Sequence, residues 1–477
     1  MTATPPDSAV SADVTSAPDS GPPPPGYKPA DGAVDEAFRA DGRVRPQYEG
    51  VLAALTAAGP AAVADAIATG AARDGVVHGT GSDAHPLAID AVPRVVDARE
   101  WAQLEAGLLQ RVRALEAFVA DAFGSREAFR AGVVPEDLLD GCPWFEPDVA
   151  DLPRDERRIA VAGPDIVRDE RGELVVLEDN VRTPTLMAFA VAARRLLEPL
   201  LAGGPRPRSL EQPLRDALLE LAGEHSVVIL GREPDNIVWW ELEQLSRMTG
   251  WPLAAIDDLA QRGDRVVLRA DATPVDLVWR RTNEDRLRTA GGALTALGRL
   301  LLHPLRAGTV RVFNGFGTGV ADDKRTYPYV EALVRFFCGE EPLLRSIPSW
   351  DLGDAGQRAE ALGRFEELVF KPRDGAGGSG IVLAPRASRD ELEALRAQIE
   401  RHPSAWMAQE PVMLSTHPTV VDGRLEPRHV DLRPFIIGGR VLPGGLSRFA
   451  QAAGELVVNC AQGGGGKDVW VLPQAAG

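Results

Sequence analysis

The chain has 477 residues, of which 44% are hydrophobic and 25% are charged, and its formal net charge at pH 7 is −17. This composition is typical of a globular protein of roughly two to four domains, and it excludes a collagen, a coiled coil and a chain disordered throughout. The acidic balance argues against nucleic acid or an anionic membrane as the main partner, and no run approaches the ~20 apolar residues of a membrane helix.

Three cysteines without a CxxC motif indicate neither a disulfide framework nor a structural zinc site. The N-terminus has no basic segment followed by an apolar one, so it is not interpreted as a signal peptide. We therefore expect a cytoplasmic protein. Residues 1–30 are rich in Pro, Ser and Ala and are predicted to form a disordered tail.

In chain order, the first clear element is a helix predicted over 97–124, where Asp97 can cap the first turn and Glu100 follows three residues later. A hairpin is predicted over 165–180 and a Pro- and Gly-rich linker over 201–213. Strands predicted at 226–230, 265–269 and 275–279, with helices at 235–248 and 290–302, indicate a small α/β unit. Later strands are predicted at 367–371, 381–383, 406–410 and 455–459, between clusters of glycine.

The segment FKPRDGAGGSGIVL holds the strongest chemical signal. Lys371 ends an apolar strand, and the loop that follows contains Gly375, Gly377, Gly378 and Gly380. Backbone N–H groups of such a loop, with a lysine beside them, can bind phosphate oxygens. A strand follows the loop, which excludes a Walker A loop and a Rossmann GxGxxG, because both lead into a helix. A glycine-rich hairpin with an exposed lysine is the alternative.

The segment LEDN supplies candidate metal ligands. Glu178 and Asn180 are two apart on a predicted strand and so share a face, and Asp165 lies on the opposing arm of the hairpin. Carboxylate and amide oxygens suit Mg²⁺ that bridges nucleotide phosphates. An acidic strand end without metal is the alternative.

Two further segments carry candidate cations. NGFGTGVADDK ends in Lys324, and RHVDLRPF places Arg433 on one strand face with Asp431 and His429. A strand-borne arginine can stabilise charge on a transferring phosphoryl group. A surface lysine at a loop-to-helix junction and a salt-bridged strand are the alternatives.

Taken together with VVLEDNVRTP, PGGLSRFA and VVNCAQGGGGKDVWVL, these segments resemble the circularly permuted type-2 ATP-grasp proteins, relatives of glutathionylspermidine synthetase-like ligases. The resemblance spans about residues 85 to 473. Glu178 and Asn180 precede Lys324 and Lys371, whereas ordinary ATP-grasp chains have the reverse order, so the hairpin returns to the nucleotide site from the N-terminal side.

The resemblance implies a mixed α/β (α+β) fold: a circularly permuted ATP-grasp with a preATP-grasp-like α/β subdomain and a glycine-rich lid. After the tail at 1–30, the expected divisions are 31–212 with the permuted metal-binding part, 213–310 as the preATP-grasp-like substrate subdomain, and 311–477 as the nucleotide-binding part with the lid.

The resemblance also implies roles for single residues, with ATP and Mg²⁺ as cofactors. ATP would be bound by Lys324, Lys371, Gly375, Gly377, Gly378, Gly380 and the backbone around Gln409 and Glu410. Asp165, Glu178 and Asn180 would hold Mg²⁺, and the catalytic residues would be Arg433, Lys324 and Arg182. Substrate contacts are expected at Thr183, Arg280 and Arg281, and in a second glycine loop at Asn459, Gln462 and Lys467.

The implied activity is ATP-dependent ligation of a carboxylate to an amine through an acylphosphate, with release of ADP and phosphate. The carboxylate would belong to a small molecule or a peptide, and a homo-oligomer is compatible with the sequence. An ATP-grasp phosphotransferase and an ATP-binding accessory protein without turnover are the alternatives.

Overall fold

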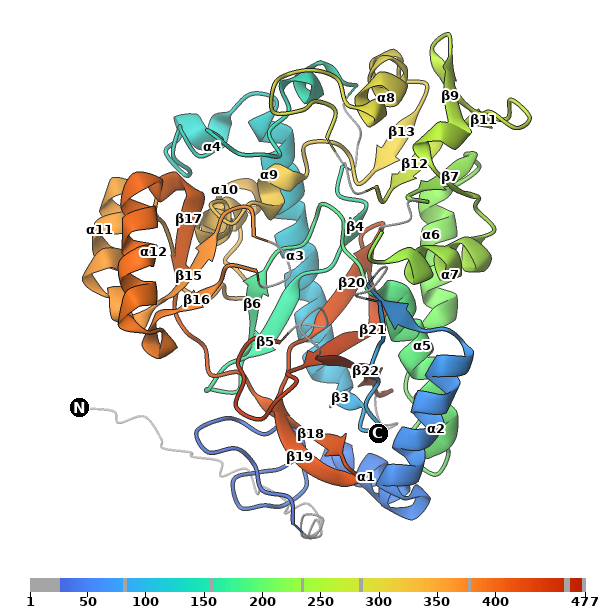
Figure 1. Ribbon diagram of the computed structural model, residues 1–477, viewed down its shortest axis with the longest axis vertical. Coiled ribbons are helices and arrows are strands. Elements are labelled where there is room, and N and C mark those ends of the chain that lie inside the picture. Colours follow the sequence, from blue (N-terminus) through green and yellow to red (C-terminus); the bar gives the residue numbers. More distant parts are fainter. Residues whose placement is uncertain are drawn as a thin grey trace, which may run out of the picture.

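The structure, a computed structural model, describes residues 26–79, 84–153, 158–232, 236–282, 286–375, 379–458 and 464–473. At its centre, a five-stranded sheet joins segments from both ends of the chain (Figure 1). In spatial order it contains β3 (Arg94–Val96), β22 (Gly465–Val471), β21 (Arg440–Phe449), β20 (Arg433–Ile437) and β4 (Val161–Ala162). The regions expected at 31–212 and 311–477 therefore share one sheet.

Helices cover both faces of this sheet. α3 (Ala98–Ala122) lies on one face, and α5 (Met187–Leu197) and α6 (Glu211–Ala222) lie on the other. Alternation along β22 explains the two layers, because Val469 and Val471 pack in the cluster of α3, whereas Trp470 packs in the cluster of α5. The site residues on β20 and the strands beside it are thus fixed by packing on both sides.

The predicted helix over 97–124 is confirmed as α3. The Asp97 side chain caps it by accepting hydrogen bonds from the backbone N–H groups of Arg99 and Glu100. Glu100 does not close a capping box and instead pairs with Arg168 at 2.6 Å. The predicted hairpin is confirmed as β5 (Asp165–Arg168) and β6 (Leu174–Glu178), with Asp165 opposite Glu178.

Of the tail predicted at 1–30, residues 1–25 lie outside the described residues, and at Tyr27 the prediction is wrong. Tyr27 is 5% exposed, stacks near Phe38 and donates a hydrogen bond to Asp35. Two short helices follow, α1 (Pro46–Ala58) and α2 (Pro60–Arg73). No single helix in the described part of the chain has the length and apolarity to span a bilayer; α1 and α2 reach both only as a pair bent by 84°.

The middle of the chain forms a parallel sheet in the order β13 (Arg311–Phe313), β12 (Leu277–Arg280), β7 (Val227–Leu230) and β8 (Leu253–Ala254). α7 (Trp239–Thr249) and α8 (Ala296–Ala307) accompany it, and an antiparallel sheet of β9 (Leu259–Arg262), β10 (Arg265–Leu268) and β11 (Pro274–Val275) projects from it. The predicted α/β unit is thus present. The predicted linker is shorter than expected, because α6 already begins at Glu211.

A third unit lies at the left of Figure 1. Its antiparallel sheet has the order β14 (Ser349–Asp351), β17 (Trp406–Gln409), β15 (Val369–Pro372) and β16 (Val382–Leu383), with α11 (Ala355–Gly363) and α12 (Arg389–Arg401) packed beside it. α9 (Gly319–Asp322) and α10 (Val330–Cys338) connect it to α3. Lys371 lies on β15 of this sheet.

Two predicted strands are corrected. The segment 428–435 is not one strand: β19 (Arg424–His429), which pairs with β18 (Thr416–Val421), ends at His429, and β20 begins at Arg433. Residues 455–458 form no strand, although their apolar run predicts one.

Candidate active site

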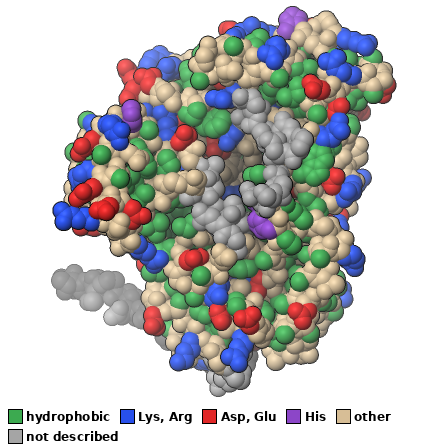
Figure 2. All heavy atoms as spheres, viewed as in Figure 1, with side chains coloured by type: hydrophobic (Ala, Val, Ile, Leu, Met, Phe, Trp, Pro, Cys, Tyr) green, Lys and Arg blue, Asp and Glu red, His purple; other side chains and the backbone are tan. Residues whose placement is uncertain are grey.

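A cavity of about 400 Å³ lies between the five-stranded sheet, the sheet of β14, β17, β15 and β16, and the β5–β6 hairpin. Figure 2 shows the surface hollowed at this place. Its lining contains most of the residues that the sequence singled out, although they come from distant segments: Asp165, Glu178, Asn180, Arg182, Thr183, Lys324, Lys371, Gly375, Gln409, Glu410 and Arg433. One cavity therefore contains the expected phosphate-binding, metal-binding and catalytic groups.

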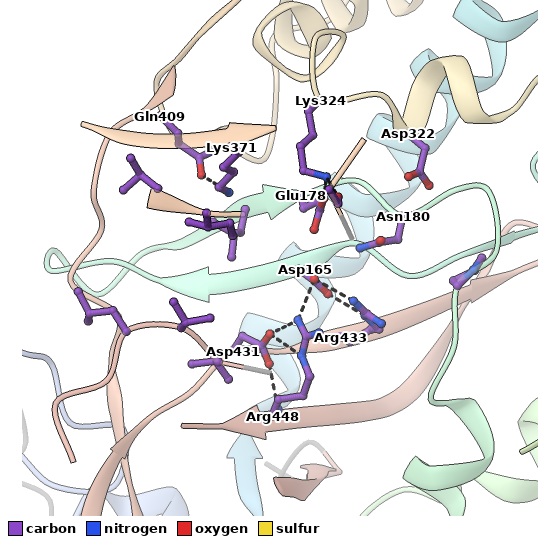
Figure 3. Close-up of a pocket in the computed structure, with 18 of the residues that line it drawn as sticks. Asp165, Glu178, Asn180, Asp322, Lys324, Lys371, Gln409, Asp431, Arg433 and Arg448 are labelled. Atoms are coloured by element: carbon purple, nitrogen blue, oxygen red, sulfur yellow. Dashed lines mark hydrogen bonds and ion pairs between the residues drawn. The ribbon is translucent and has the colours of Figure 1, made fainter. Parts of the chain in front are cut away.

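The two lysines line the cavity with different partners (Figure 3). Lys324 lies 3.0 Å from a carboxylate oxygen of Glu178 and donates a hydrogen bond to the carbonyl of Gly375. Lys371 donates to Oε1 of Gln409 at 2.6 Å. Burial, together with the charge of Lys324, lowers the pKa of Lys371 to about 8. The ammonium groups of both lysines thus lie at one wall of the cavity, where they can neutralise the charge of a bound anion.

An acid–arginine cluster forms another wall of the cavity. Arg433 donates to both carboxylate oxygens of Asp165, at 2.7 and 2.8 Å. Arg448, on β21, lies 2.8 Å from the same carboxylate and also pairs with Asp431. Burial by itself raises the pKa of Asp165, but the charges of Arg433 and Arg448 outweigh it and hold the pKa at about 2. Asp165 is thus ionised and fully engaged.

This pairing bears on the ligand set expected for Mg²⁺, in which Asp165 stays a prediction. Both oxygens of Asp165 are taken by arginines, so the described oxygens best placed for a cation belong to Glu178 and Asn180, with Asp322 beside them. The amide nitrogen of Asn180 is buried without a hydrogen-bond partner. Burial, with the nearby Glu178 carboxylate, raises the pKa of Asp322 despite the charge of Arg182. The carboxylate oxygens of Glu178 and Asp322 and the amide oxygen of Asn180 are hard donors that fit such a cation, although no cluster of three His, Cys, Asp or Glu among the described residues does so by itself.

The opposite end of the cavity is formed by the turn that follows Asn180. The guanidinium of Arg182 lies 3.8 Å from the ring centroid of Trp144, and its backbone N–H donates to Asp322 at 2.9 Å. Thr183 lines the cavity next to it. Arg182 is thus a cation stacked on an aromatic face at the cavity wall, which suits recognition of a carboxylate.

Arg280 and Arg281 are placed differently from the expectation. Neither lines the cavity: Arg280 lies over the ring of Phe316 at 4.6 Å, and Arg281 is buried. Arg281 donates to the carbonyl of Pro184 and lies 3.5 Å from a carboxylate oxygen of Glu241. Arg281 thus holds the backbone beside Thr183, and a direct contact of either arginine with substrate stays a prediction.

The position predicted for Lys467, in a second glycine loop, is wrong. Lys467 lies in strand β22 rather than in a glycine loop, is fully buried, and pairs with Asp90. It does not line the cavity. Asn459 and Gln462, expected in the same loop, lie outside the described residues, as do Gly377 and Gly378 of the first glycine loop.

The part of the glycine loop that the structure describes has a steric reason for its composition. Gly380 has φ +73°, and a Cβ there would lie 2.9 Å from Pro372. In the segment expected to bind ATP through its backbone, the N–H of Glu410 donates to the carbonyl of Pro348, and the Glu410 side chain pairs with Arg364 at 2.7 Å. The backbone N–H of Glu410 is therefore already used within the protein.

Sequence reasoning gave no role to three residues that the cavity contains: Trp144, Asp322 and Arg448. Asp322 and Arg448 stand inside quoted motifs, ADDK and GGLSRF, so their signal was present. The sequence contains no signal for a functional role of Trp144, because an isolated tryptophan is typical of a protein core.

Comparison with known proteins agrees with this geometry. The model of the family described as circularly permuted ATP-grasp type 2 matches residues 93–450, and the chain belongs to this family. The fold is likewise that of a glutathione synthetase-like effector of Globodera pallida in its apo form, with a TM-score of 0.56 at 13% identity over 87% of this chain and 98% of that one. The permuted order of motifs and the mixed α/β fold are thereby confirmed.

Three relatives indicate how far the similarity extends along the chain. A protein of Frankia alni, provisionally named glutamate–cysteine ligase 2-3, is 41% identical over 93% of this chain, and a second Frankia relative of like name is 39% identical. The chain spans about half the length of these two proteins, 54% of each. An uncharacterized protein of Mycobacterium tuberculosis is 37% identical over 93% of this chain and 85% of its own length.

Proposed function

We propose that the protein is an ATP-dependent carboxylate–amine ligase that forms an amide through an acylphosphate. One observation carries the proposal: a single cavity brings together two lysines, a carboxylate–amide oxygen pair and the Asp165–Arg433–Arg448 cluster. Positioning and charge neutralisation are the main requirements of phosphoryl transfer. No cysteine or serine stands among the described lining residues, and this chemistry needs neither.

In the first step, a carboxylate oxygen of the acid attacks the γ-phosphorus of ATP, and the bond to the ADP oxygen breaks. Lys324 and Lys371 neutralise phosphate charge, and Arg433 faces the γ-phosphate from the opposite wall. Arg182, stacked on Trp144, binds the acid beside Thr183. When bound, Mg²⁺ supplies Lewis-acid neutralisation of phosphate oxygens, and Glu178 and Asn180 would hold it.

In the second step, the amine nitrogen attacks the acyl carbon, the carbon–oxygen bond to phosphate breaks, and inorganic phosphate leaves. The names of the Frankia relatives suggest L-glutamate as the first acid to test and L-cysteine as the first amine. Both substrates are part of the proposal.

The test is ATP turnover with Mg²⁺, L-glutamate and hydroxylamine, with ADP, AMP and hydroxamate as readouts. We expect ADP and a hydroxamate in equal amounts, both lost in the Lys371→Ala variant. AMP as the product contradicts an acylphosphate. If the products are ADP and a stable phosphorylated compound without hydroxamate, the protein is a phosphotransferase and not a ligase.

A further inference from the structure

His78 stands in the cavity wall without a role in the chemistry described so far. It ends the short strand β1 (Val77–His78), which pairs with β2 (His85–Pro86) so that His78 lies opposite His85. Its side chain lines the cavity, and the residue is 8% exposed. A buried imidazole at a cavity wall normally has a hydrogen-bond partner within the protein.

His78 lacks such a partner. Its Nδ1 is buried and makes no hydrogen bond to the described residues. The ring contacts are those to Phe189, with centroids 6.0 Å apart, and to His85 at 5.8 Å.

Two other buried histidines show the contrast. His417 is bonded through both ring nitrogens, to the Pro418 carbonyl and the Tyr48 hydroxyl, each at 3.0 Å. His429 is bonded through Nδ1 to the Leu414 carbonyl at 2.7 Å. Both are structural, and neither lines the cavity. Of these three histidines, the one that lines the cavity is the one whose buried ring nitrogen has no hydrogen-bond partner among the described residues.

The position of His78 along the cavity identifies which substrate it faces. Its ring contact Phe189 belongs to the first turn of α5, directly after the turn that contains Thr183. The next backbone N–H, of Gly79, donates to the carbonyl of Ile237 at 3.1 Å, and Ile237 also lines the cavity. His78 thus lies at the acid-binding end, whereas Gln409 and Glu410 belong to the lid sheet and the segment after it.

We propose that His78 binds the amine substrate and accepts its proton, which deepens the proposed ligase function and rests on it. As the amine nitrogen forms its bond to the acyl carbon, the carbon–oxygen bond to phosphate breaks. Before this attack the bound ammonium gives one proton to the imidazole ring of His78, which passes it to water, and the second proton leaves the nitrogen with the departing phosphate. A positioned base of this kind accelerates such a step by about 10²–10⁴-fold.

The surroundings keep the ring neutral and ready to accept a proton. Burial, with the nearby His85, lowers the pKa of His78. α5 presents the uncharged Phe189, and the nearby acid of α7, Glu241, turns to the backbone N–H of Ala188 at 3.2 Å. No described carboxylate is paired with His78 to raise its affinity for protons.

The test compares two nucleophiles in one variant. Hydroxylamine is unprotonated at neutral pH and needs no base, whereas L-cysteine arrives as an ammonium. In His78→Gln we expect ATP- and glutamate-dependent hydroxamate within twofold of wild type, and glutamate–cysteine amide formation lower by at least tenfold. The matched control is His85→Gln, which removes the ring opposite His78 and leaves both rates within threefold.

A second variant separates a chemical role from a structural one. In His78→Ala, imidazole added to the assay should restore amide formation, and pyrazole, which has the same shape but is a much weaker base, should not. Equal loss of amide and hydroxamate in both variants, or restoration by both additives, overturns the role of His78. Absence of hydroxamate in the wild-type protein overturns the proposed function, and this role with it.

Discussion

Asp165 on β5 and Arg433 on β20 are separated by 268 positions in the chain, yet two hydrogen bonds of 2.7 and 2.8 Å join them at the floor of the cavity. Both residues are buried. The pair therefore connects the N-terminal hairpin to the C-terminal sheet at the place where the permuted motifs meet. Site geometry and the closure of the fold depend on the same contact.

Loss of the Asp165 charge should destabilise the protein strongly. In Asp165→Asn, Arg433 and Arg448 remain buried with one carboxylate, Asp431, between them, and breaking a buried ion pair in this way costs about 3–5 kcal/mol. We expect a loss of about that size in the free energy of unfolding, measured by denaturant titration.

The matched control for this loss is Glu220→Gln, which breaks the surface pair of Glu220 with Arg440. Both side chains are about 60% exposed, so the expected change is below about 1 kcal/mol. A small and equal effect of the two substitutions would show that the buried cluster contributes nothing particular to stability.

The pKa of Lys371 makes ATP use dependent on pH. Its value of about 8 in the free protein means that the ammonium is charged below pH 8 and becomes neutral above it. We expect kcat/KM for ATP to fall as pH rises through about 8, because the phosphates lose one cation. Lys371→Arg keeps the charge and should lack this basic limb.

Lys28→Arg is the control for this pH profile, because Lys28 is exposed and distant in sequence from every cavity residue. It should retain the wild-type profile. If the fall in kcat/KM for ATP at high pH persists unchanged in Lys371→Arg, the group that titrates is not Lys371.

Trp144 is expected to act on the acid substrate through Arg182. The guanidinium lies 3.8 Å from the Trp144 ring, and a desolvated contact of this kind contributes about 2 kcal/mol. In Trp144→Leu, we expect the KM for the acid to rise by roughly tenfold and the KM for ATP to change little. Arg126→Gln removes a cation–π contact with Phe129 away from the cavity and should change neither.

Local patterns in the sequence predicted the elements that carry the site. The period of apolar residues and the cap at Asp97 define α3, and the turn at 169–172 places Asp165 opposite Glu178. The pairing of Asp165 with Arg433 could not be predicted, because it depends on how hairpin and sheet pack, which no local pattern encodes. A hydrogen-bonded carboxylate and a metal-binding carboxylate have the same sequence signature.

The glycines near Lys467 show a second limit. A run of glycines predicts a loop, yet a Cβ at Gly465 would lie 2.3 Å from the Phe449 ring, and a Cβ at Gly466 3.1 Å from Leu446. These glycines are required by close packing of β22 on β21, and Lys467 is therefore carried into the core. The sequence alone does not distinguish a glycine that makes a loop flexible from a glycine that close packing requires, because the residues that pack against it are distant in the chain.

The buried pair of Arg281 and Glu241 holds the turn on which substrate recognition is proposed to depend. Arg281 donates to the Pro184 carbonyl, and Glu241 accepts from the backbone N–H of Ala188 at 3.2 Å. Between them, Leu186 has φ +88°, a conformation that costs a non-glycine residue energy and persists only when its surroundings fix it. Arg281, directly after β12, and Glu241, on α7, supply that fixation.

Removal of either partner should therefore affect stability and substrate binding together. We expect Arg281→Met and Glu241→Gln each to lower the free energy of unfolding by about 3 kcal/mol, since each leaves a buried charge unpaired. The double variant should lose at least about 1 kcal/mol less than the sum of the two, because the residues interact directly.

In each variant that folds, the KM for the acid rises more than the KM for ATP, since the turn with Thr183 moves and the lysine wall does not. Strict additivity of the two losses in denaturant titrations, or equal shifts in both KM values, would contradict a joint role in holding this turn.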